Sequence, residues 1–176
     1  MIALIFQISL LVYHQVTTGI DLYPFNGVRS TKPVERRIEQ AVNGVLMGLP
    51  VIGFIFQIDW IIYYGVAYYF ILFAVECATW WMPYFFGASD KWLEIYVRVH
   101  STTVGLLPGR DRRTAPNLEH LILMALTVAT AVVTLCRFKM LHPEGYPRVW
   151  IPISIGVVSF LSTAMQQMRN AKPKTA

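Results

Sequence analysis

The chain has 176 residues, enough for a single domain over residues 1–176, and hydrophobic residues make up 55% of it. Charged residues make up only 14%, whereas soluble domains carry about a quarter, and they lie between long apolar blocks. This distribution excludes an ordinary soluble fold and predicts an integral membrane protein. The net charge of +5 resides in the gaps and the tail, which argues against a nucleic-acid partner.

Five apolar blocks predict an all-α, polytopic transmembrane helical bundle. Each block approaches the roughly 20 residues that a spanning helix needs, and none shows the alternation of a barrel strand. The blocks cover residues 2–18, 41–58, 60–83, 118–138 and 149–168.

The first block, residues 2–18, carries His14, and Asp21 follows two helical turns further on. No basic residue precedes this block and no small-residue cleavage pattern follows it, so we expect a retained helix and not a signal peptide. For His14, the structural alternative is a neutral ring that is satisfied by an interhelical hydrogen bond.

Only Gln57, Ile58 and Asp59 separate the second block from the third, which predicts a tight helical hairpin or a re-entrant segment. Gly44 and Gly48 lie four residues apart in the second block. Small residues at this spacing allow helices to approach closely. They predict an interface for a homodimer or for a larger membrane complex, with a kinked, flexible helix as the alternative.

Residues 89–106 mix apolar side chains with Lys91, Glu94 and Arg98, which predicts an amphipathic helix on the membrane surface. A short sixth span is the alternative. Proline, glycine and charge then predict a loop, after which Asn117 is expected to cap the fourth spanning helix.

Basic residues predict the orientation of the bundle. With five spans and the N-terminus outside, twelve of the fifteen Lys and Arg residues face the cytoplasm. Because cytoplasmic loops are enriched in Lys and Arg, we expect an outer N-terminus and a cytoplasmic C-terminus. The surface helix then lies on the cytoplasmic side.

Glu76 lies inside the third block, where an ionised carboxylate is costly. Helical spacing places Tyr69, Phe73 and Trp80 near its face, so we expect an acid within an aromatic wall. Burial disfavours the charged carboxylate, which suits proton donation. A structural acid that is hydrogen-bonded to a neighbouring helix is the alternative.

The predicted topology brings ionisable residues from distant parts of the chain to the cytoplasmic half of the membrane. They are His14, Asp21, Glu76, His100, Glu119 and His120. We expect them to line an intramembrane cavity for a lipophilic or lipid-like small molecule.

In this cavity Glu76 is expected to donate or accept a proton, with Asp21 or His14 as its catalytic partner. The other three ionisable residues and the aromatic wall are expected to bind the ligand, although capping of a helix is the alternative role for Glu119. No histidine pair has metal-ligand spacing and no cofactor signature is present, so neither a metal nor a cofactor is expected.

Several of these segments resemble the emopamil-binding/EXPERA superfamily, which includes a sterol isomerase and the sigma-2 receptor. The first helix, with His14 and Asp21, is similar to that family's first helix, and the segment from Glu76 to Phe86 is similar to its acid-bearing helix. Similar segments follow at residues 91–92, 100–103, 107–108 and 117–121. The resemblance implies an acid pair, Asp21 and Glu76, that faces a pocket for sterols or lipophilic amines. The second and fifth blocks are additions to that family's four-helix fold.

The sequence leaves two other functions open. One is a non-catalytic subunit of a larger membrane complex, in which the polar residues form hydrogen bonds with partner chains. The other is a small transporter or a proton-conducting module, although the sequence shows no inverted repeat.

Overall fold

The computed structural model describes residues 1–109, 112–141, 143, 154–160, 162–163 and 166. The described chain contains four helices that are long and apolar enough to cross a membrane. The predicted all-α membrane fold is thus confirmed, with four candidate spans. Half of the predicted fifth span, residues 149–168, lies outside the described residues.

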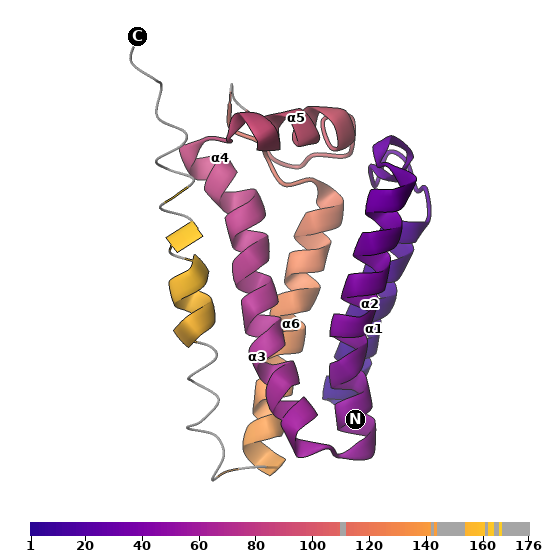
Figure 1. Ribbon diagram of the computed structural model, residues 1–176, viewed down its shortest axis with the longest axis vertical. Coiled ribbons are helices and arrows are strands. Elements are labelled where there is room, and N and C mark those ends of the chain that lie inside the picture. Colours follow the sequence, from indigo (N-terminus) through magenta and orange to yellow (C-terminus); the bar gives the residue numbers. More distant parts are fainter. Residues whose placement is uncertain (110–111, 142, 144–153, 161, 164–165, 167–176) are drawn as a thin grey trace.

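The long helices run along the long axis of the molecule, and a shorter one lies across its upper end (Figure 1). The long helices are α1 (Ile2–Gly19), α2 (Pro33–Phe56), α3 (Asp59–Glu76) and α6 (Leu118–Leu141). A π-helical turn, Cys77–Trp81, joins α3 to α4 (Met82–Phe86), and the crossing helix is α5 (Asp90–Val99). Toward the upper end α3 diverges from the α1–α2 pair, while the N-terminus lies at the lower end (Figure 1).

The lower end is held by close packing between α2 and α3. A Cβ on Gly53 would lie 2.8 Å from the Cβ of Ile61, and a Cβ on Gly65 would lie 2.9 Å from that of Pro50. Because real Cβ atoms do not approach this closely, both positions require glycine. Gln57 turns the chain between the helices in the left-handed conformation, with a φ of 54°. This is the tight hairpin that the sequence predicts.

Gly44 and Gly48, the predicted interface pair, have different surroundings. A Cβ on Gly44 would lie 3.2 Å from the side-chain nitrogen of Gln15, so this glycine serves the packing of α2 on α1. Among the described residues, no atom lies within 4 Å of a Cβ built on Gly48. A homodimer or a complex partner at this face stays a prediction, and Gly48 is the member of the pair that is open to it.

Polar side chains bridge helices inside the bundle. Thr127, Thr130 and Thr134 lie on the inner face of α6 and are fully buried. Thr134 accepts a 3.1 Å hydrogen bond from Gln7, and Thr130 donates to the carbonyl oxygen of Phe6. A polar group among apolar side chains is costly unless it has such a partner. These hydrogen bonds therefore fix α1 against α6.

Helix boundaries differ from the apolar blocks where charge is involved. α2 begins at Pro33, well before residue 41, because proline suits the first helical turn and Glu35 is favoured near a helix N-terminus. α5 ends at Val99, and residues 100–109 form a loop where the sequence predicted helix up to residue 106. Asn117 caps α6 as predicted, since its Oδ1 accepts a 3.1 Å hydrogen bond from the backbone N–H of His120.

Candidate functional site

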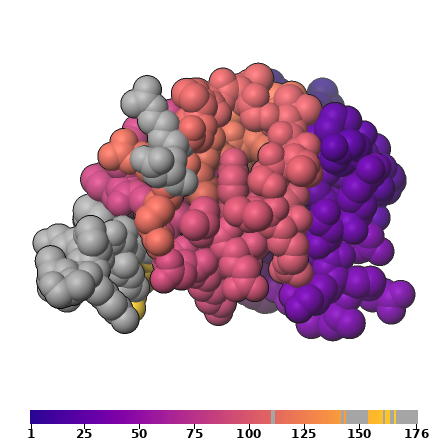
Figure 2. All heavy atoms as spheres, turned by 90° about the horizontal axis from the view of Figure 1, so that it is seen from above, coloured from indigo at the N-terminus to yellow at the C-terminus, as the bar shows by residue number. Residues whose placement is uncertain are grey.

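A cavity of about 450 Å³ lies at the upper end of the bundle, beneath α5. Its walls come from α1, α2, α3 and α6, where α3 diverges from the α1–α2 pair (Figure 1). Seen from above, the segment from α4 through α5 to the start of α6 covers the middle of this face, and the α1–α2 connection lies beside it (Figure 2). The volume falls in the range of small-molecule sites.

Glu76 lines the cavity at the end of α3, directly before the π-helical turn, and is 6% exposed. Its Oε1 accepts a 2.9 Å hydrogen bond from Thr127 on α6. Its Oε2 is buried and has no hydrogen-bond partner among the described residues. A buried oxygen without a partner is costly, and this cost makes Glu76 a candidate functional residue. π-helical turns are themselves frequent at functional sites.

His120 lines the cavity from the first turn of α6. Its ring packs on Trp80 of the π-helical turn, with 4.1 Å between the ring centroids. Its Nδ1 lies 2.6 Å from Oδ1 of Asn117 and 3.8 Å from Oε2 of Glu119. An amide oxygen and a carboxyl oxygen thus both face the same ring nitrogen.

Helix α5 covers the cavity and is here called its roof. His100 directly follows α5 and lines the cavity. Its ring centroid lies 5.0 Å from that of Trp80 and 5.2 Å from that of His120. Burial lowers the pKa of His100 to about 4, so its ring is neutral at physiological pH. Trp92 completes this aromatic cluster: it lies 5.3 Å from Trp80, and its indole N–H donates to Thr114.

His14 lines the cavity from α1 and is bonded to α2. Its Nε2 lies 3.2 Å from the side-chain nitrogen of Asn43 and 3.9 Å from Oε1 of Glu39. The interhelical hydrogen bond that was the structural alternative for this histidine is therefore present. Its Nδ1 is buried without a hydrogen-bond partner in the described part of the chain.

Two contacts hold α5 over the cavity. A Cβ on Gly27 would overlap the carbonyl oxygen of Val99, so only glycine lets the end of α5 approach the 3₁₀ turn Val28–Ser30 this closely. Arg98 of α5 lies 3.4 Å from Glu35 at the start of α2, in a partly exposed ion pair. The roof is thus fastened to the α1–α2 connection.

The backbone of Val104, here called the strap, links the loop that follows α5 to two other segments. Its backbone N–H donates to the carbonyl oxygen of Pro24 at 2.9 Å, and its carbonyl oxygen accepts from the N–H of Leu118 at 2.8 Å. The loop before α6 is therefore bonded both to the α1–α2 connection and to α6 itself.

Three predicted site residues do not line the cavity. Asp21 is 41% exposed at its side chain and pairs with Arg29 at 3.1 Å. The hydrogen bond from Arg29 lowers the pKa of this carboxyl, which keeps it ionised at neutral pH. Tyr69 is fully buried in the core with Leu10, and Phe73 is half-buried. Both lie near the face of Glu76, but Phe73 is one turn and Tyr69 two turns deeper in the bundle.

A polar wall on α2 was not predicted from the sequence. Glu35, Glu39 and Asn43 line the cavity. They recur at a four-residue spacing, which places them on one face of a helix. Glu35 and Glu39 were assigned to a loop because the apolar block begins at residue 41, and Asn43, inside that block, was not assigned to the site. Recognising Pro33 as a helix start would have revealed it.

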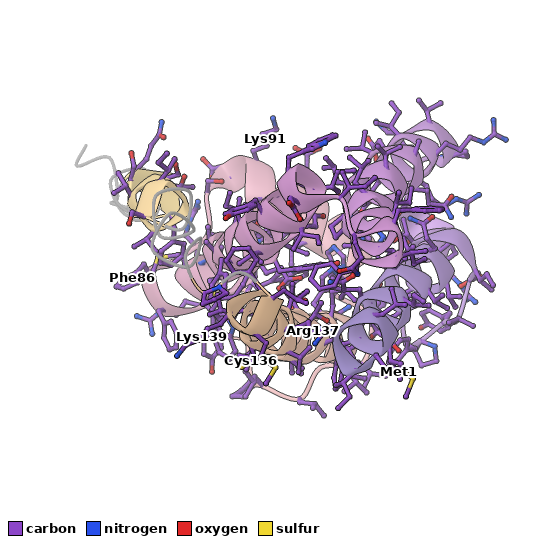
Figure 3. The ribbon with its side chains drawn as sticks, turned by 90° about the horizontal axis from the view of Figure 1, so that it is seen from below. Met1, Phe86, Lys91, Cys136, Arg137 and Lys139 are labelled. Carbon is purple, nitrogen blue, oxygen red and sulfur yellow. The ribbon has the colours of Figure 1, made fainter. Side chains whose placement is uncertain are left out.

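The upper end combines aromatic surface, neutral imidazole and carboxyl groups. In the described residues, no group of three or more His, Cys, Asp or Glu side chains could hold a metal ion. Cys136 and Lys139 lie on the outer face of α6, away from the other helices (Figure 3). The arrangement at the upper end suits a largely apolar molecule with one polar group, and proton exchange with that group.

Comparisons of the chain with protein-family models, with curated proteins and with solved structures gave no match. The cavity and the residues that line it are therefore the features that indicate a function.

Proposed function

We propose that the protein binds a lipophilic, lipid-like small molecule in the cavity and that Glu76 exchanges a proton with the bound molecule. The observation that carries the proposal is that Glu76 lines the cavity and that its buried Oε2 has no hydrogen-bond partner among the described residues. Apolar and aromatic side chains, among them Leu72, Leu123 and Trp80, line the same cavity and suit the apolar body of such a molecule.

The position of one wall residue supports a ligand that arrives from the membrane. Val75 lines the cavity and is also 54% exposed, although it lies on α3, one of the candidate membrane spans. An exposed apolar side chain on a spanning helix is suited to contact with lipid. A molecule dissolved in the bilayer therefore meets the cavity wall directly, without passing through water.

The basic residues support a cavity on the cytoplasmic side. The described residues include ten Lys and Arg residues, of which Arg137 and Lys139 lie on the lower half of α6. The other eight lie on segments of the upper end: Arg29, Lys32, Arg36, Arg37, Lys91, Arg98, Arg112 and Arg113. By the positive-inside rule, the upper end is cytoplasmic and the N-terminus is outside.

The resemblance to the emopamil-binding/EXPERA superfamily suggests sterols and lipophilic amines as the first probes. The proposal differs from that resemblance in the acids of the site. Asp21 pairs with Arg29, whereas Glu119 and Glu39 line the cavity with Glu76.

Thermal unfolding of the purified protein in lipid nanodiscs tests the proposal, with a panel of sterols and lipophilic amines. A ligand that binds only the folded state raises the unfolding midpoint. We expect one class of probe to raise it by several degrees. Glu76→Gln keeps the shape of the side chain but removes its ionisation, so we expect it to abolish the ligand-dependent increase.

Glu94→Gln is the matched control, because Glu94 is exposed on α5 and does not line the cavity. This variant should respond to ligand like the unmodified protein. A panel without any stabilising member, or an undiminished response of Glu76→Gln, would contradict the proposal.

A further inference from the structure

We infer that His120 presents Nε2 to the cavity as a fixed hydrogen-bond acceptor, and that the ligand carries a hydroxyl or N–H donor beside its apolar body. Asn117 is the positioning residue that holds the ring in this state. The statement about the ligand deepens the proposed function and rests on it. The statement about the ring stands on the hydrogen bonds around Asn117 alone.

The amide of Asn117 has one permitted orientation. The residue is 2% exposed, and its Oδ1 accepts a hydrogen bond from the backbone N–H of His120. Its nitrogen donates to Oγ1 of Thr103 at 2.9 Å. The hydroxyl of Thr103 donates in turn to the carbonyl oxygen of His100 at 2.7 Å, so Oγ1 is left to accept. A flipped amide would set donor against donor at the backbone N–H and acceptor against acceptor at Thr103.

This orientation determines which nitrogen of His120 carries the hydrogen. Oδ1 of Asn117 lies 2.6 Å from Nδ1, and an amide oxygen can only accept, so Nδ1 is the donor. Glu119 Oε2, at 3.8 Å from the same nitrogen, favours the same assignment. A neutral imidazole carries one ring hydrogen, so Nε2 has the free lone pair.

The free lone pair is accessible from the cavity. The side chain of His120 is 20% exposed and lines the cavity, while its Nδ1 is turned to Asn117. Trp80 covers one face of the ring, and the His100 ring meets it at an interplanar angle of 89°. The edge of the ring remote from Nδ1 is therefore the part that a ligand can reach.

An acceptor held in this way selects between ligands of equal shape. A ligand with a hydroxyl or N–H group satisfies Nε2, whereas a methyl ether of the same length leaves it without a donor. Because an unpaired polar group in a site of this kind is costly, we expect about a tenfold or larger difference in affinity.

The state of the ring is measurable without any ligand. ¹⁵N NMR of histidine-labelled protein in nanodiscs, with His120 assigned by the loss of its signals in His120→Phe, should show a protonated Nδ1 and an unprotonated Nε2. Thr103→Val removes the acceptor of the Asn117 amide, which should allow the amide to flip and give a mixture of tautomers. Thr102→Val, the same change at an exposed neighbour, should leave the spectrum unchanged. A protonated Nε2 at neutral pH would overturn the assignment, and an unaltered tautomer in Thr103→Val would overturn the part given to Thr103.

The ligand statement is tested with dodecanol, its methyl ether and dodecylamine at equal mole fraction in the bilayer. We expect the alcohol or the amine to stabilise the protein at about tenfold lower content than the ether, and His120→Phe to remove this difference. Selection of the alcohol identifies a hydroxyl ligand, and selection of the amine alone identifies an ammonium ligand. Equal binding of the ether overturns this inference and leaves the proposed function intact, whereas no binding by any of the three and by the sterol and amine panel overturns both.

Discussion

The two ends of the bundle are held together by different means. At the lower end, Gly53 and Gly65 let the backbones of α2 and α3 meet in a tight hairpin. At the upper end the helices diverge, and three residues that line the cavity each have a buried polar atom without a partner in the described chain: Glu76 Oε2, His14 Nδ1 and His100 Nδ1. Unpaired polar atoms cost stability, and here they are retained at the cavity. Close packing at the lower end thus offsets the stability that the unpaired polar atoms cost at the upper end.

A larger side chain at Gly53 disrupts the packing of α2 on α3 at the lower end and should have the largest effect on the free energy of unfolding. In Gly53→Val the added atoms start at a Cβ that lies 2.8 Å from Ile61, so we expect a loss of at least about 3 kcal/mol in the free energy of unfolding. Gly48→Val is the matched control, since a Cβ there meets open space. Denaturant titration of both variants in micelles measures the difference. Equal destabilisation would show that the hairpin does not depend on this close approach.

Protonation of His100 should destabilise the fold at the upper end, where the cavity lies. Its pKa is about 4 in the fold, against 6.5 as the ordinary value, because burial disfavours the charged ring. The unfolded chain therefore takes up a proton first as the pH falls from about 6.5 to 4, and the fold loses up to roughly 3 kcal/mol across this window. His100→Phe keeps a ring against Trp80 but cannot titrate. Unfolding free energies at pH 7.5 and 4.5 should differ less in this variant, and an identical pH dependence would show that His100 is not responsible.

Removal of the ion pair between Arg98 and Glu35 at the upper end should have the smallest effect on the free energy of unfolding. It lies 3.4 Å across and is partly exposed, so Arg98→Ala should cost at most about 1 kcal/mol. The cost should shrink at high salt, because surface charges are screened. Lys91→Ala, on the outward side of α5, serves as the control (Figure 3). Unfolding at low and high salt measures the effect, and a loss of several kcal/mol would mean that the roof depends on this pair far more than its exposure indicates.

The fold was predictable to the extent that hydropathy alone determines it. Long apolar blocks predicted the four described spans, and the cap at Asn117 followed from its residue type. The start of α2 at Pro33 was missed, because hydropathy marks the part of a helix that enters lipid and not the helix itself. The π-helical turn Cys77–Trp81 was also missed, since no residue type in the sequence marks it.

The site residues were predictable where the order and direction of the helices are enough to place them at the same depth in the membrane. His14, Glu76, His100, Glu119 and His120 come from four segments and all line the cavity. Asp21 does not, because a carboxyl beyond the end of a helix is free to pair with a nearby arginine, here Arg29. The state of His120 was beyond the sequence, because it depends on a chain of hydrogen bonds through Asn117 and Thr103.

The strap at Val104 imposes an order on biosynthesis. It needs the carbonyl oxygen of Pro24, made early, and the N–H of Leu118, which begins the last of the described spans. A nascent chain that has inserted only α1, α2 and α3 lacks the second of these partners and the whole α6 wall. The site is therefore complete only after α6 has been made, and until then Glu76 lacks the hydrogen bond from Thr127.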